Sequence, residues 1–79
     1  MRRLNVTVID PYSLDGIEGA FVAVDDPIAT TKSGVTDDLG QITFSEVGFV
    51  GTITVTAGKE GYERGSVVVF DARDVTLAL

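Results

Sequence analysis

Two segments in which apolar and polar residues alternate constrain the fold of this chain more than any other feature. Residues 41–45 place Ile42 and Phe44 on one side, and residues 52–57 alternate apolar residues with three threonines. A period of two residues is that of a β-strand with one buried face. The glycine-containing segment 48–51 lies between them, so the sequence predicts a β-hairpin.

A tight turn is predicted immediately before this hairpin. Asp37 and Asp38 can accept hydrogen bonds from nearby backbone amides, and Gly40 can adopt the positive φ that closes a chain reversal. A β-branched residue is strained at positive φ, so we expect Gly40→Val to destabilise the fold.

The rest of the chain predicts further short strands and no helix. Alternating or β-branched residues occupy 4–10, 20–24, 65–70 and 75–79, and another strand is expected to begin at 34–36. Together with the hairpin these segments make seven regularly spaced strands, the pattern of a β-sandwich or barrel. A chain of 79 residues is expected to form one domain.

The central stretch resembles the carboxypeptidase regulatory-like domains, which are transthyretin-like (prealbumin-like) β-sandwiches. Their usual pattern is a turn with Thr-Asp and Gly, an alternating strand, a glycine turn, a second alternating strand and a closing Gly-Tyr. The matching positions here are Thr36, Asp37, Gly40, Ile42, Phe44, Gly51, Ile53, Val55, Gly61 and Tyr62. Residues 16–24 are similar to the family's second strand, so the resemblance covers about residues 6–79. Two departures are Ile42, where the family usually has an aromatic residue, and the absence of a proline after Glu46.

The resemblance carries expectations about fold and function. It implies a seven-stranded, immunoglobulin-like (prealbumin-like) sandwich, antiparallel with a Greek-key-type crossover. The sequence starts and stops within a few residues of its first and last predicted strands, so we expect residues 1–79 to be one domain of this kind taken from a larger protein, where it contacts neighbouring domains. Such domains are spacers, adhesion modules or peptidase accessories in surface and exported proteins, so an extracellular or cell-envelope setting is expected.

The composition argues against several classes of function. Six basic and twelve acidic residues give a net charge of −6, which disfavours binding to nucleic acid or anionic membranes. The chain has no histidine and no cysteine, so a histidine-based serine triad and thiolate metal sites are excluded. No apolar run is long enough for a membrane span, and none follows the N-terminal arginines as a secretion signal would require. We therefore expect a protein without enzymatic activity.

Acidic residues concentrate in loops that should share one end of the sandwich. If consecutive strands run antiparallel, the loops at 10–19, 37–40 and 58–63 lie together. The carboxylates they would bring together, called here the five loop carboxylates, are those of Asp10, Asp15, Asp37, Asp38 and Glu60. Carboxylate oxygens are ligands for calcium. Aspartate is also a common turn former, and no Asp-x-Asp-x-Asp spacing is present. We expect turn residues and no cofactor, with calcium as the alternative.

Apolar residues on the outward side of the strands are candidates for an interaction surface. Because Ala20, Val22 and Val24 face inward by their alternation, Phe21 must face outward. Grouped exposed apolar residues usually mark a contact site. The predicted interaction surface consists of Ile9, Phe21, Phe49 and Phe70.

Two alternatives compete with an interaction module. A carbohydrate-binding module would need two or more aromatic residues on one exposed face, and Tyr62 and Phe44 are expected to be buried. A transthyretin-like homodimer would use the outward Phe21 and Phe70. The oligomeric state is therefore expected to be a monomer or a weak homodimer.

Overall fold

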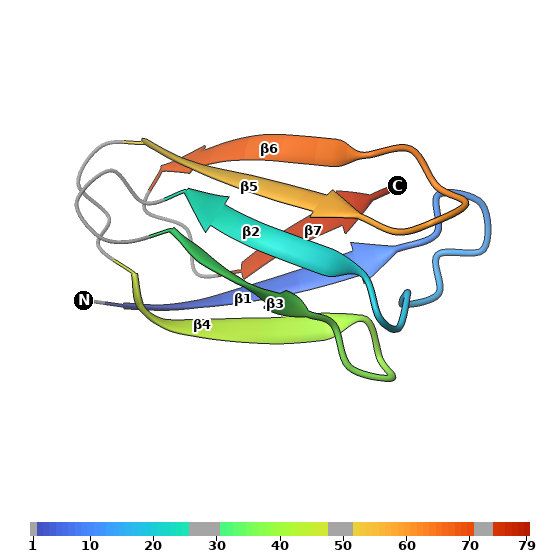
Figure 1. The fold of residues 1–79 in the computed structure, drawn as a ribbon, viewed down its shortest axis with the longest axis horizontal. Coiled ribbons are helices and arrows are strands. Elements are labelled where there is room, and N and C mark those ends of the chain that lie inside the picture. The colour runs from blue at the N-terminus through green and yellow to red at the C-terminus, as the bar shows by residue number, and fades with distance from the viewer. Residues whose placement is uncertain (1, 26–30, 48–51, 71–73) are drawn as a thin grey trace.

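The computed structural model describes residues 2–25, 31–47, 52–70 and 74–79, which form a two-layered β-sandwich (Figure 1). The described residues contain no helix, and so none that is long and apolar enough to cross a membrane. The strands are β1 (Arg2–Ile9), β2 (Phe21–Asp25), β3 (Lys32–Val35), β4 (Gln41–Val47), β5 (Thr52–Gly58), β6 (Gly65–Phe70) and β7 (Asp74–Ala78). The predicted fold class, a seven-stranded immunoglobulin-like (prealbumin-like) sandwich, is confirmed.

The strands divide into a sheet of three and a sheet of four. The first has the order β4-β1-β7 and the second the order β3-β2-β5-β6. All pairs are antiparallel except β1 with β7, which is parallel, so the prediction of antiparallel pairing is wrong for this one pair. The reason is topological: successive strands reverse direction, and the first and seventh strands, which point the same way, become neighbours.

The predicted hairpin between residues 41–45 and 52–57 is also wrong. β4 pairs with β1, whereas β5 lies in the other sheet between β2 and β6. Alternation identifies which face of a strand is buried, but two strands that face each other across a core show the same period as two that pair. The connecting residues 48–51 lie outside the described part of the chain.

The core lies between the two sheets and consists of the residues that the alternation points inward. Val6, Val8, Val22 and Val24 are fully buried, and Phe44 is buried as predicted. Ile42 is only partly buried and packs against the edge of this cluster. The other buried apolar residues are Leu4, Ile17, Ala20, Ile53, Val55, Ala57, Val75 and Leu77.

Three loops lie together at one end of the sandwich, at the right of Figure 1. They are the β1–β2, β3–β4 and β5–β6 connections, as the alternation of strand direction predicts. Thr36, a buried polar residue, ties the first two together: its Oγ1 accepts a hydrogen bond from the Ala20 amide at 2.9 Å and donates one to the Ile17 carbonyl at 2.5 Å. The Val8 amide also donates to the Gly40 carbonyl at 2.8 Å. This network fixes the β1–β2 and β3–β4 connections as one unit.

Candidate binding groove

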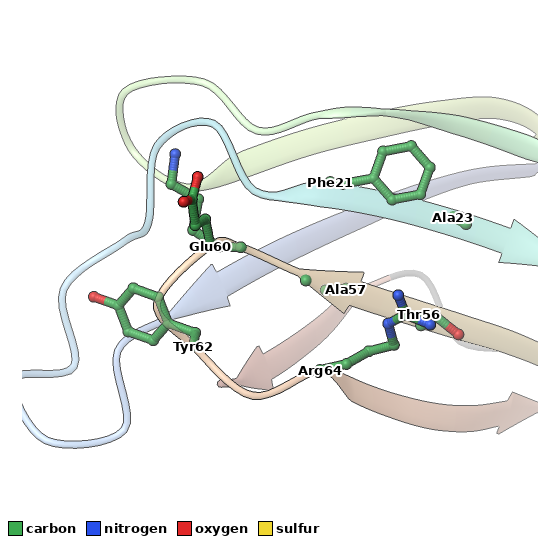
Figure 2. A pocket seen from close by; sticks show the side chains of 9 residues that line it. Phe21, Ala23, Thr56, Ala57, Glu60, Tyr62 and Arg64 are labelled. Carbon is green, nitrogen blue, oxygen red and sulfur yellow. The ribbon is translucent and has the colours of Figure 1, made fainter.

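A groove of ≈ 680 Å³ lies on the outer face of the four-stranded sheet, next to the loop end (Figure 2). Strand residues form its floor and the β5–β6 loop forms part of its wall. The residues that line it are Phe21, Ala23, Thr56, Ala57, Gly58, Lys59, Glu60, Tyr62 and Arg64. Apolar and charged groups therefore meet in one hollow.

The register between β2 and β5 creates the groove. Phe21 lies opposite Gly58 and Ala23 lies opposite Thr56, and directly opposed residues point to the same face of a sheet. Gly58 has no side chain to cover the phenyl ring, and Phe21 remains 53% exposed. The Arg64 side chain approaches Gly58 from the other side, with Nε 3.9 Å from where a Cβ on Gly58 would lie. In Figure 2 the Phe21 ring and the Arg64 side chain flank the end of β5.

Phe21 and Val35 form an exposed apolar pair that runs from the groove toward the edge of the sheet. Val35 on β3 lies opposite Phe21, and 61% of its surface is exposed. The outward orientation of Phe21 therefore follows the prediction. Contact of Phe21 with a partner stays a prediction.

Of the other members of the predicted interaction surface, the structure describes the side chain of Ile9, which does not lie beside Phe21. Ile9 is partly buried and belongs to β1, in the opposite sheet. The backbone of Phe70 ends β6 opposite Thr52, but the described residues include neither its side chain nor Phe49. Sequence reasoning missed Val35, which alternation alone does not distinguish from any other residue of a short edge strand.

Two basic side chains line the groove of this protein, whose net charge is negative. Lys59 and Arg64 both line it, beside the single carboxylate of Glu60. These are two of only six basic residues in a chain of net charge −6. The groove is therefore less acidic than the chain as a whole.

Tyr62 links the groove to the β1–β2 loop. Its hydroxyl donates a hydrogen bond of 3.0 Å to Oδ2 of Asp10, and 40% of its surface is exposed. The prediction that Tyr62 is buried is wrong, because the residue lies in the loop beyond β5 and packs along the rim. Figure 2 shows its ring directed toward the β1–β2 loop, away from Phe21.

Asp10 is held by its own turn as well as by Tyr62. Its Oδ1 accepts hydrogen bonds from the amides of Tyr12 at 2.8 Å and Ser13 at 3.1 Å. These two backbone bonds, and then the bond from Tyr62, lower the pKa of Asp10 below its ordinary value. The same bond and the negative charge of Asp10 raise the pKa of Tyr62. Both shifts favour the hydrogen-bonded pair at neutral pH.

The five loop carboxylates share one end of the fold but do not form a cluster. Asp37 uses Oδ1 to accept bonds from the amides of Leu39 and Gln41, both at 2.9 Å, within its own turn. Glu60 lines the groove, and Asp10 faces Tyr62. Across the described residues, no three acidic, histidine or cysteine side chains stand close enough together to hold a metal ion. Calcium binding therefore remains the alternative to the turn-forming role, without a preformed site among the described residues.

Comparison with known proteins supports the fold without naming a family. No protein family matches the sequence, and no curated protein shows significant similarity. Among solved structures, the fold is similar to that of the major pilin subunit of Bacillus cereus, with a TM-score of 0.68 and 19% identity. The match covers 100% of this chain and 29% of the pilin chain, so the chain spans less than a third of that protein. At this identity the likeness shows an immunoglobulin-like β-sandwich and leaves the narrower family open.

Proposed function

We propose that this chain is a non-catalytic β-sandwich module, of the carboxypeptidase regulatory-like kind, that serves as a structural or interaction unit of a larger exported or surface protein. The observation that carries the proposal is the structural likeness of the entire chain to a part of a pilin subunit that makes up 29% of the pilin chain. A fold that recurs as one part of a longer chain is suited to work beside neighbouring domains.

The contact surface of this module is the outer face of the four-stranded sheet. The exposed cross-strand pair Phe21 and Val35 supplies apolar area, and Lys59 and Arg64 supply positive charge at the same end. An apolar centre with a charged rim is the usual anatomy of a protein interface. A neighbouring domain of the parent protein would cover this face.

The size and location of the natural protein test the proposal. An antibody raised against the domain is used to probe surface, membrane and cytosolic fractions of cells that produce it. We expect an antigen in the surface or secreted fraction, with a mass well above the 8.3 kDa of this chain. A cytosolic antigen of 8.3 kDa would contradict the proposal.

A carbohydrate-binding role is the second candidate, because two aromatic residues line the groove. Phe21 and Tyr62 are both substantially exposed there, and Glu60, Arg64 and Thr56 offer polar groups for sugar hydroxyls. NMR titration with α-linked and β-linked oligosaccharides tests it. Shifts at the groove that Phe21→Ala abolishes and Val68→Ala preserves would support binding, since Val68 lies on the same face outside the groove. An absence of shifts at millimolar sugar would dismiss it.

A further inference from the structure

Each of the two sheets ends in two edge strands, and they differ in how they are protected. The edges are β4 and β7 in one sheet and β3 and β6 in the other. An edge strand carries unpaired backbone amides and carbonyls, which can template pairing with another strand. Proteins suppress such pairing with short edges, charged side chains, proline or bulges.

Three of the four edge strands carry a charged residue. β3 has only four residues, and Lys32 lies opposite the buried Val24, a position that presents charge to any strand added there. β4 contains Glu46 and β7 contains Asp74. β6 has six residues, Gly-Ser-Val-Val-Val-Phe, with no charged residue and no proline. β6 is therefore the edge without these protective devices.

The free side of β6 is apolar as well as uncharged. β6 pairs with β5 from Gly65 to Phe70, and no other described strand pairs with it. Val67 and Val69 point inward and are only half-buried at this border of the core, while Val68 points outward and is 62% exposed. In Figure 1 β6 forms the upper border of the molecule. An added strand would pair the backbone groups and cover the exposed parts of these valines.

We propose that β6 is a strand-addition site, which accepts an extended apolar segment of another polypeptide as a fifth strand of the four-stranded sheet. The unpaired backbone requires an extended partner, because only a strand presents donors and acceptors at matching spacing. Val67 and Val69 require apolar side chains at alternate positions of that partner. The net charge of −6 repels a second copy of this chain and favours a segment flanked by basic residues.

NMR with the isotope-labelled chain tests the site. The probe is a synthetic peptide in which valine and threonine alternate over the length of β6, with lysines at both ends. We expect shifts at Gly65–Phe70, and amide exchange slowed at least about tenfold at every second residue of β6, whose amides point away from β5. Glutamates in place of the lysines should weaken binding severalfold at low salt, and added salt should reduce this difference.

Two controls separate strand pairing from other contacts. A peptide with the same side chains and N-methylated strand amides keeps its shape and apolar area but cannot donate backbone bonds, so it should not bind. Val67→Lys, which copies the inward charge of Lys32 on β3, should abolish binding, whereas Ser33→Lys on β3 should leave it unchanged. If Val67→Lys does not fold, the methylated peptide still decides the matter.

Three results would overturn the proposal. The first is an absence of shifts in β6, and the second is shifts centred on Phe21 and Arg64 in the groove. The third is a dimer of the free chain that protects β6 and is seen by sedimentation, because a second copy would then occupy the edge. None of these measurements depends on the location or size of the parent protein, so the site and the proposed function can fail separately.

Discussion

Gly40 is a position at which a single added methyl group should be strongly destabilising, because strain and a close backbone approach coincide there. Its φ is +76°, and a Cβ there would lie 2.6 Å from both the Val8 carbonyl oxygen and the Ile17 amide nitrogen. It would also lie 2.7 Å from Cα of Gly16. These are backbone atoms, and the Ile17 amide donates to the Val8 carbonyl at 2.8 Å. The β3–β4 turn would have to move, and the loop end would lose its hydrogen bonds to β1.

The expected cost of Gly40→Ala has two parts. The left-handed conformation costs an alanine about 1–2 kcal/mol, and forcing a methyl group into a packed site costs about 1–3 kcal/mol more. The sum, about 2–5 kcal/mol, is a large share of the roughly 4–12 kcal/mol that holds a domain of this size together. Gly40→Ala should therefore lie near the limit of stable folding.

Gly61→Ala is the matched control. Gly61 also has positive φ, +90°, but no atom lies within 4 Å of where its Cβ would be. Only the conformational penalty applies, about 1–2 kcal/mol. Urea unfolding followed by circular dichroism measures both variants, and equal m-values license the comparison. Equal losses at Gly40 and Gly61 would refute the close approach between the β3–β4 turn and the β1–β2 loop.

Three further perturbations test the loop end. Replacing Thr36 with Val removes the hydroxyl that bonds Ala20 and Ile17; unfolding free energy should fall by about 1–3 kcal/mol, and Thr36→Ser should recover part of it. Tyr62→Phe removes the bond to Asp10, and its destabilisation should be full between about pH 4 and 10 and should diminish as the pH falls through the lowered pKa of Asp10 or rises through the raised pKa of Tyr62. The signs follow from the pKa shifts. Because the pKa of Asp10 is lowered in the folded state, its charged form stabilises the fold at pH values above 3.8, the ordinary pKa of the group. Because the pKa of Tyr62 is raised, its protonated form stabilises the fold at pH values below 10.0. A constant difference from pH 2 to pH 7 in thermal unfolding would contradict this assignment. Millimolar calcium should not shift the backbone amide resonances of the residues that carry the five loop carboxylates. NMR shifts confined to those residues would contradict this prediction and support a calcium site.

The buried face of each strand could be predicted from the sequence, because the alternation of apolar and polar residues within one strand identifies its buried face. Val24 on β2, and Ile53 and Val55 on β5, alternate with polar or small residues and are all fully buried. An extended chain places successive side chains on opposite faces, so two or three residues suffice to identify the inner one. The sandwich class follows from several such strands without a helix.

Strand neighbours could not be predicted in the same way, because pairing depends on residues far apart in the chain. The parallel contact of Val6 with Val75 joins the first and last strands, and neither segment differs in period from an antiparallel one. The groove depends on the same information: Phe21 is exposed because Gly58, rather than a larger residue, lies opposite it on β5. Nothing within either strand specifies that register.

The loop carboxylates show why residues that share one end of a fold need not share a site. Asp37 closes its own turn by accepting the amides of Leu39 and Gln41, and Asp10 does the same for Tyr12 and Ser13. A carboxylate engaged in this way points toward its own backbone, so its oxygens are aimed along the turn rather than across to the next loop. The tie between Asp10 and Tyr62 is consistent with this, since a phenol hydroxyl reaches the one oxygen that the turn leaves free. Asp10 and Asp37 thus stabilise their own turns, and Asp10 also joins the β1–β2 loop to Tyr62 of the β5–β6 loop.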